Sequence, residues 1–191
     1  MDKTLKVGIQ GNIGSSNYRA ALHFAKKYQW QNPEFVALLT THRVLEALAS
    51  KEIDYGTFAW ESSRVGLVAE TQAAIKTFSY HKLDEIDLEM NHAIFTRPGD
   101  LPGPGPQVFS HPQALAEHAA YLRERFPAYQ PQPEIDTALA AERLAKGEYP
   151  VGSLAIAPLG CLTLFHLELV ASELPSNQGY WTKIFLAERA S

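Results

Sequence analysis

The chain has 191 residues, of which 46% are hydrophobic and 20% are charged, and its net charge is −4. This length fits one large domain or two small lobes, and the acidic balance without a basic tract argues against nucleic acid as a partner. No apolar run approaches the roughly 20 residues that a transmembrane helix needs, and the lone Cys161 allows no internal disulfide, so we expect a cytoplasmic protein without membrane contact.

The first 78 residues alternate between strand and helix patterns. The N-terminus enters a strand pattern at once, so we expect no signal peptide. Strands are predicted over residues 5–11, 34–39 and 54–60. Helices are predicted over residues 15–28, 41–52 and the later part of 61–78, with Ser15 or Ser16 and Thr41 as N-caps. This alternation predicts a mostly parallel sheet flanked by helices.

The second half repeats the pattern after a break. A long alternating strand over residues 87–98 is suited to crossing between lobes, and the proline- and glycine-rich loop 98–106 is expected to be a hinge. Further strands are predicted over 107–110, 129–135, 151–157, 167–174 and 180–189, and helices over 111–126 and 136–148, with Pro112 in a first turn and Asp136 or Thr137 as a cap. We therefore expect two α/β lobes with a cleft between them, one formed by residues 1–85 plus 178–191 and the other by residues 86–177.

Polar side chains follow three of the predicted strands. They are Ser15 and Ser16 in the turn 11–17, Glu61, Ser62 and Ser63 in the turn 60–66, and Ser110, His111 and Gln113 in the turn 110–113. Ligands of open α/β sheets bind beyond the carboxyl ends of strands, and helix N-termini bind carboxylates or phosphates. Each turn is equally explained as a capped helix start.

Other classes of site have little support in the sequence. There is no dinucleotide fingerprint, P-loop or nucleophile elbow. The seven histidines are scattered, without an H-E-x-x-H motif, so we expect no metal and no cofactor. Thr182 and Lys183 enter the last strand as neighbours and should point to opposite faces of its sheet, unless a turn or bulge breaks the pleat.

Taken together, four segments resemble the catalytic domain of prephenate dehydratase. They are "GNIGSSNYRAAL", "ESSRVGLVAET", "SHPQALAEHAAYL" and "WTKIF", in the family's order. The resemblance implies two α/β lobes similar to type II periplasmic binding proteins. It also implies the conversion of prephenate to phenylpyruvate and association as a homodimer. The family's C-terminal regulatory module is expected to be absent.

The resemblance also implies roles for individual residues. Thr182 corresponds to the threonine that assists the departing hydroxyl, and Gln113 and Glu61 are retained with it as catalytic residues. Thr137 matches a family threonine that supports the cleft, and Lys183 and the other polar residues of the turns would bind prephenate or a similar acid. Two positions depart from the family. Ser62 replaces an asparagine, and Lys183 replaces an arginine, so the planar guanidinium that binds a carboxylate through two hydrogen bonds is lost.

These departures leave two alternatives to a prephenate dehydratase. One is a prephenate decarboxylase-like lyase, which would remove carbon dioxide and keep the hydroxyl. The other is a non-catalytic two-lobed protein that binds a small acid.

Overall fold

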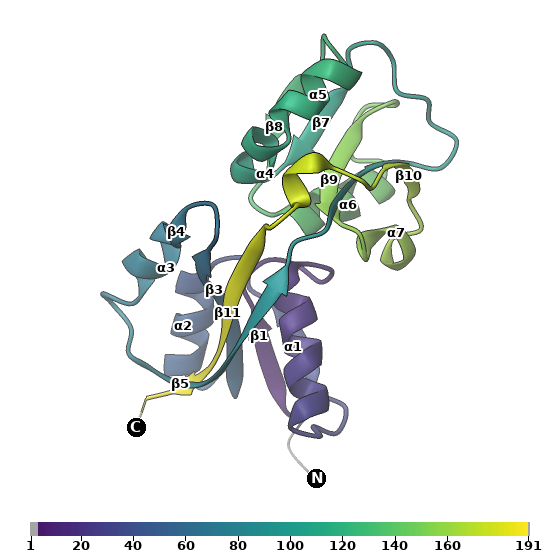
Figure 1. Cartoon of the computed structure of the whole chain (residues 1–191). Coiled ribbons are helices and arrows are strands. Elements are labelled where there is room, and N and C mark those ends of the chain that lie inside the picture. The colour runs from purple at the N-terminus through teal and green to yellow at the C-terminus, as the bar shows by residue number, and fades with distance from the viewer. Residues whose placement is uncertain (1–3, 191) are drawn as a thin grey trace. The chain divides into compact units, whose positions relative to one another are not determined.

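The computed structural model describes residues 4–190, and the chain divides into two compact units (Figure 1). The first unit comprises Met1–Glu89 and Tyr180–Ser191, and the second comprises Met90–Gly179. Both combine a sheet with helices, so the expected class of two α/β lobes is confirmed. Within residues 4–190, no helix has both the length and the apolar character that a membrane crossing requires.

The sheet of the first unit has the order β2-β1-β3-β11-β5, with β4 paired to β3. Its strands are β1 (Lys6–Ile9), β2 (Glu34–Ala37), β3 (Tyr55–Ser62), β4 (Gly66–Leu67), β5 (Tyr80–Glu89) and β11 (Trp181–Arg189). β1 is parallel to β2 and β3, whereas β11 runs antiparallel to both of its neighbours. The sheet is therefore mixed, because the last strand of the chain inserts between β3 and β5, and not mostly parallel as predicted.

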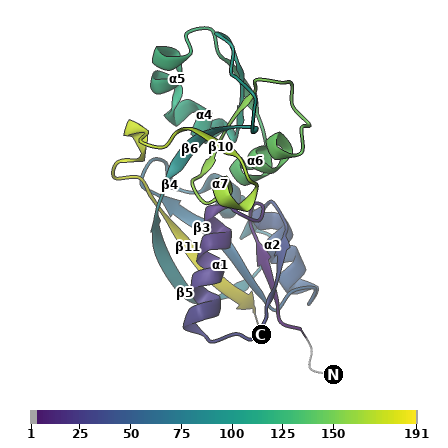
Figure 2. The same cartoon turned by 90° about the vertical axis from the view of Figure 1, so that its right-hand side faces the viewer.

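Helices cover both faces of this sheet. They are α1 (Ser16–Lys27), α2 (Thr41–Ala49) and α3 (Ala69–Ala74). Phe24 of α1 packs with Ile184 and Leu186 of β11 on one face, and the turned view shows α1 lying across the strands (Figure 2). Val44 of α2 packs with Phe185 on the other face. Alternate residues of β11 thus supply two separate cores.

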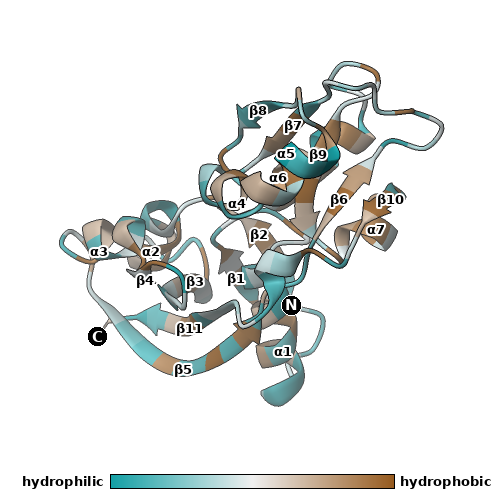
Figure 3. Cartoon of the chain, turned by 45° about the horizontal axis from the view of Figure 1, so that its top comes forward, coloured by the Kyte–Doolittle hydropathy of each residue, from teal (hydrophilic) through white to brown (hydrophobic). Residues whose placement is uncertain are grey.

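The edge strand β5 shows the same alternation in its hydropathy, which appears as successive teal and brown bands (Figure 3). Ile86 and Leu88 face the core beneath α1, and Asp87 between them is exposed. The predicted single strand over 87–98 was wrong: β5 ends at Glu89, and a new strand begins at His92 in the second unit. The start of β5, from Tyr80, was missed.

The second unit is a mixed sheet of order β10-β6-β9-β7-β8. Its strands are β6 (His92–Thr96), β7 (Gln107–Ser110), β8 (Gln130–Pro133), β9 (Leu154–Pro158) and β10 (Glu168–Ala171). The proline-rich segment 98–106, expected as a hinge, joins β6 to β7 inside this unit.

The helices of the second unit also lie on two faces. They are α4 (Pro112–Glu117), α5 (Ala119–Arg125), α6 (Thr137–Ala145) and α7 (Cys161–Leu164), with a 3₁₀ turn, η1 (Pro175–Asn177). Leu115 and Leu122 of α4 and α5 pack against Ile94 and Ile156, while Ala141 of α6 packs in a second cluster with strand residues of the opposite face. The single helix predicted over 111–126 is broken at His118, which ends α4 and precedes α5.

Candidate functional site

The polar side chains singled out from the sequence are divided between the two units. The first unit carries Ser15, Ser16, Glu61, Ser62, Ser63, Thr182 and Lys183. The second unit carries Ser110, His111, Gln113 and Thr137.

The end of β3 and the start of β11 form an irregular antiparallel pair. Thr182 lies opposite Ser62 and Lys183 lies opposite Glu61, but the next residue of β11 pairs with Ala59, so Trp60 is an additional residue on β3. A bulge of this kind bends the strand that carries the additional residue and re-aims its side chains. The irregularity of this strand pair therefore lies on β3.

β11 itself keeps its pleat at this point. Its register against β5 is regular here, with Thr182 opposite Leu88 and Lys183 opposite Asp87. Successive side chains of an unbroken strand point to opposite faces. Thr182 therefore shares a face with Leu88, and Lys183 faces the other way, as expected for a regular strand.

Lys183 is engaged by acidic residues of β5. Its Nζ lies 3.1 Å from Glu85 Oε1 and 3.2 Å from Asp87 Oδ1, and these hydrogen bonds raise the pKa of the lysine. Its charge links β11 to β5 on the face opposite Thr182. The structure therefore does not bring Lys183 and Thr182 together toward a common ligand.

The serines of the turn after β3 hold that turn against β11. The Ser63 hydroxyl accepts a hydrogen bond of 3.0 Å from the Trp181 N–H, and the Ser63 N–H donates to the Trp181 carbonyl at 3.0 Å. The Ser62 hydroxyl accepts from the Arg64 N–H at 3.2 Å. Both oxygens thus support the local backbone, as a turn-forming interpretation of this motif predicts.

Thr182 and Glu61 differ from these serines. Thr182 is 93% buried, as its exposed fraction is 7%, yet its hydroxyl forms no hydrogen bond within residues 4–190. Within the same range the Glu61 carboxylate has no hydrogen bond or ion pair. The fold therefore leaves these two functional groups available for a ligand.

The turn after β1 begins a capped helix. The Ser15 hydroxyl accepts from the Tyr18 N–H at 3.2 Å and caps α1, and Ser16 is the first residue of that helix. Ser15 as N-cap was one of the two predicted possibilities. In the next helix the cap is Thr40, which accepts from the Arg43 N–H at 3.2 Å, so the prediction of Thr41 was wrong by one residue.

A polar network that was not predicted from the sequence connects this turn to β3 and α2. Gln10 Nε2 donates to Glu70 Oε2 at 2.9 Å, while Gln10 Oε1 accepts from the Ala59 N–H at 2.7 Å and from Asn17 Nδ2 at 3.3 Å. Glu70 Oε1 accepts from the Thr41 N–H at 2.5 Å, where a carboxylate also stabilises the helix N-terminus. Most of the partners are far apart in sequence, so no local motif predicts these hydrogen bonds.

In the second unit, the motif that follows β7 is largely used by the fold. The buried Ser110 hydroxyl donates to the Ile156 carbonyl at 2.7 Å. His111 is the N-cap of α4, since its Nδ1 accepts from the Gln113 N–H at 3.3 Å. Gln113 Nε2 donates to Glu117 Oε1 at 3.0 Å, which fixes its amide along the helix.

Thr137 is the first residue of α6, and Asp136 is its cap, with Oδ1 accepting from the Leu139 N–H at 2.8 Å. One of the two predicted caps is thereby confirmed. The Thr137 hydroxyl has no hydrogen bond in the part of the chain that the structure describes.

Comparison with known proteins identifies the family. The model of the prephenate dehydratase family matches residues 7–190. The chain belongs to this family. Arogenate dehydratase 5, chloroplastic, of Arabidopsis thaliana is 25% identical over 186 residues, which are 97% of this chain and 42% of the plant protein. Prephenate dehydratase of Lactococcus lactis is 28% identical over 149 residues, 75% of this chain and 50% of that protein.

Among solved structures, a prephenate dehydratase from Arthrobacter aurescens in complex with L-Phe superposes with a TM-score of 0.82 at 20% identity. The match covers 98% of this chain and 61% of that one. At this identity the likeness shows the fold. The chain spans about half the length of the curated family members that it matches.

Proposed function

We propose that this chain is a lyase that removes water and carbon dioxide from prephenate or a closely related acid. The match to the family over residues 7–190 supports this function. The observation that carries the catalytic role is the Thr182 hydroxyl, which belongs to a residue only 7% exposed and makes no hydrogen bond within the described residues. The names of the relatives, arogenate and prephenate dehydratases, make both acids candidate substrates.

The proposed reaction makes one aromatic ring. The bond between the ring carbon and its carboxylate breaks to give carbon dioxide, and the electron pair of that bond enters the ring. The bond between the opposite ring carbon and its hydroxyl breaks, and the departing hydroxide takes up a proton to become water. With prephenate the remaining product is phenylpyruvate. Because aromatisation drives the step, the protein needs to bind the acid and assist the departure of hydroxide.

In this proposal Thr182 donates a hydrogen bond to the departing hydroxyl, and Glu61 and Gln113 act with it as catalytic residues. Ser15, Ser16, Ser62, Ser63, Ser110, His111 and Thr137 stay predicted substrate contacts. Lys183 was predicted with them, but it would have to leave Glu85 and Asp87 to reach the acid. No metal or cofactor enters the proposed steps. Proton transfer by a positioned side chain contributes about 10²–10⁴-fold to a rate.

Purified chain incubated with prephenate, with ultraviolet absorbance followed after alkali, tests the proposal. We expect phenylpyruvate to form, kcat to fall about 10²-fold or more in Thr182→Val, and most activity to remain in Thr182→Ser, which keeps the hydroxyl. A non-aromatic product would replace the dehydratase by the decarboxylase alternative. Equal turnover in the valine and serine variants would remove Thr182 from the mechanism.

A second candidate function is a non-catalytic protein that binds a small acid. The observation that favours it is the engagement of Lys183 by Glu85 and Asp87, because the cation that replaces the family's arginine is then occupied by the fold. Stabilisation of the chain against heat by prephenate, without any product, would support this function over the lyase.

We also propose that the chain is a cytoplasmic homodimer, as the resemblance to the family implies. Light scattering of the purified chain tests the dimer, since a monomer at micromolar concentration would contradict it.

A further inference from the structure

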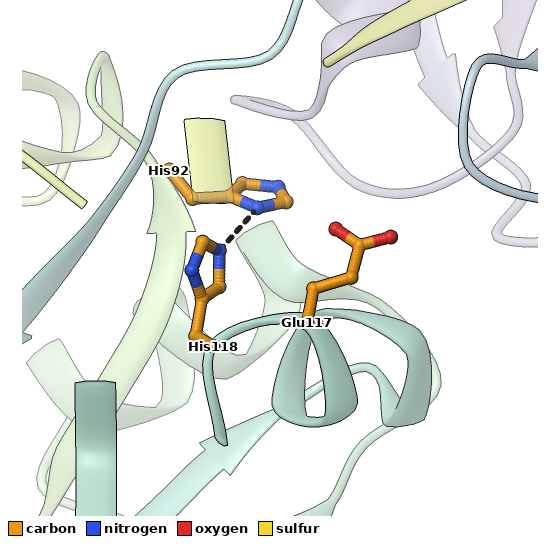
Figure 4. A group of neighbouring side chains, drawn as sticks. All are labelled: His92, Glu117 and His118. Atoms are coloured by element: carbon orange, nitrogen blue, oxygen red, sulfur yellow. Dashed lines mark hydrogen bonds between the residues drawn. The ribbon is translucent and has the colours of Figure 1, made fainter. Parts of the chain in front are cut away.

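Two buried histidines and a glutamate converge inside the second unit (Figure 4). His92 Nδ1 lies 3.1 Å from His118 Nε2. One nitrogen of each ring and one carboxylate oxygen of Glu117 all lie within 4.8 Å of one another. The scattered histidines of the sequence predict no metal site, but the fold brings together two of them that are 26 positions apart.

The start of one strand and the end of one helix position these side chains. His92 is the first residue of β6, and Glu117 is the last residue of α4. His118 follows directly and adopts φ −96° and ψ 4°, which ends α4 before α5 begins. A continuous helix would rotate neighbouring side chains about 100° apart. The break at His118 accompanies the convergence of neighbouring side chains on one point.

A second layer of contacts holds the cluster in place. Ser176 Oγ forms a short hydrogen bond with His118 Nδ1, the ring nitrogen that faces away from His92. Asn177 pairs with the backbone of His92 in both directions, accepting at Oδ1 (3.2 Å) and donating from Nδ2 (2.8 Å). Gln113 donates to Glu117. Such partners orient the ligands of metal sites in proteins.

The ligand chemistry suits a transition metal. Burial lowers the pKa of His92 to about 3 and that of His118 to about 4, so both rings are neutral near pH 7 and each offers a lone pair. Zinc–nitrogen bonds of about 2.0–2.1 Å put two ligands of a tetrahedral ion roughly 3.3 Å apart, close to the observed 3.1 Å. Imidazole favours zinc, copper, iron and nickel, whereas magnesium and calcium prefer oxygen ligands.

We propose that His92, His118 and Glu117 bind one divalent transition-metal ion of the zinc class through His92 Nδ1, His118 Nε2 and a Glu117 carboxylate oxygen. The ion replaces the hydrogen that the two rings share. That proton moves to the other nitrogen of the ring that carried it, so both imidazoles stay neutral and each presents a lone pair to the ion. It links β6 to the break between α4 and α5, beside the Gln113 amide. This inference does not depend on the lyase activity.

Titration of the chelator-treated full chain with zinc by calorimetry, and with cobalt by visible absorbance, tests the site. We expect one ion per chain, cobalt bands of a low-symmetry site with nitrogen and oxygen ligands, and a rise in melting temperature with zinc. Glu117→Gln keeps the size of the side chain and an oxygen that can accept the hydrogen bond from Gln113. It should weaken zinc binding at least 10-fold. His118→Asn should abolish it.

His166→Ala is the matched control, because this exposed histidine of the same unit lies outside the cluster. It should leave the affinity unchanged. Circular dichroism checks that each variant folds, and Glu117→Gln keeps the test decisive if His118→Asn does not. No binding at micromolar zinc by the folded wild-type chain would overturn the proposal, as would equal affinity in wild type and Glu117→Gln.

Discussion

The end of β3 with the start of β11 in the first unit, and the β7–α4 turn in the second unit, carry similar sets of polar side chains, but the fold uses them differently. In the second unit Ser110, His111 and Gln113 all have hydrogen-bond partners inside the unit. In the first unit Thr182 and Glu61 have none among the described residues. The polar residues that the sequence predicts as one functional site therefore include side chains that stabilise the local backbone and side chains that are available to a ligand.

The largest effect on stability should come from Ser110→Ala. The variant leaves the buried Ile156 carbonyl without its 2.7 Å hydrogen bond, which should lower the free energy of unfolding by about 1–3 kcal/mol. Urea denaturation measures it. Thr137→Ala is the control in the same unit and should stay within about 0.5 kcal/mol. Equal losses of unfolding free energy in the two variants would contradict the distinction between a hydroxyl that is hydrogen-bonded in the fold and one that is not.

In the first unit the matching test is Glu70→Gln. The carboxylate accepts from Gln10 and from the N-terminus of α2, so loss of its charge should cost about 1–2 kcal/mol. A double-mutant cycle with Gln10→Ala should give a coupling energy of about 0.5 kcal/mol or more. The control is Glu124→Gln on the exposed surface of α5, which should leave the free energy of unfolding unchanged. If the losses of free energy in Glu70→Gln and Gln10→Ala simply add, the two side chains do not form a network.

One N-cap in each unit tests whether the units respond separately. Ser15→Ala removes the cap of α1, and Asp136→Ala removes the cap of α6. Each should cost about 1 kcal/mol. Hydrogen exchange followed by mass spectrometry should show faster exchange in the first unit for Ser15→Ala and in the second for Asp136→Ala. Faster exchange throughout the chain in either variant would show that the two units open together.

The features predictable from the sequence are those set by a few neighbouring residues. The strand and helix alternation, the caps at Ser15 and Asp136, and Pro112 at the start of α4 depend on local rules. The Thr40 cap was missed because two threonines stand side by side and either can cap a helix. Nothing local distinguishes them.

The features that were missed depend on contacts between distant segments. The insertion of β11 between β3 and β5 makes the first sheet mixed, and it also creates the bulge at Trp60. The pairing of His92 with His118 requires the packing of β6 against the break between α4 and α5. Hydrophobic periodicity assigns each segment its type but does not specify its neighbours.

The smallest expected effect concerns Lys183, and it bears directly on the comparison between used and unused groups. Its two carboxylate partners lie on β5, and Glu85 and Asp87 are substantially exposed. Exposed ion pairs contribute about 0.2–1 kcal/mol, so Lys183→Met should lower the free energy of unfolding by no more than about 1 kcal/mol, and less at high salt.

Because Lys183 and Thr182 point to opposite faces of the sheet, Lys183→Arg should not raise turnover or tighten prephenate binding, although it restores the arginine of the family. Steady-state kinetics at fixed ionic strength measures both quantities. A higher kcat/KM in Lys183→Arg together with a lower kcat/KM in Lys183→Met would mean that this cation leaves Glu85 and Asp87 to bind the acid. In that case the charge would belong with Thr182 and Glu61 among the groups that act on a ligand.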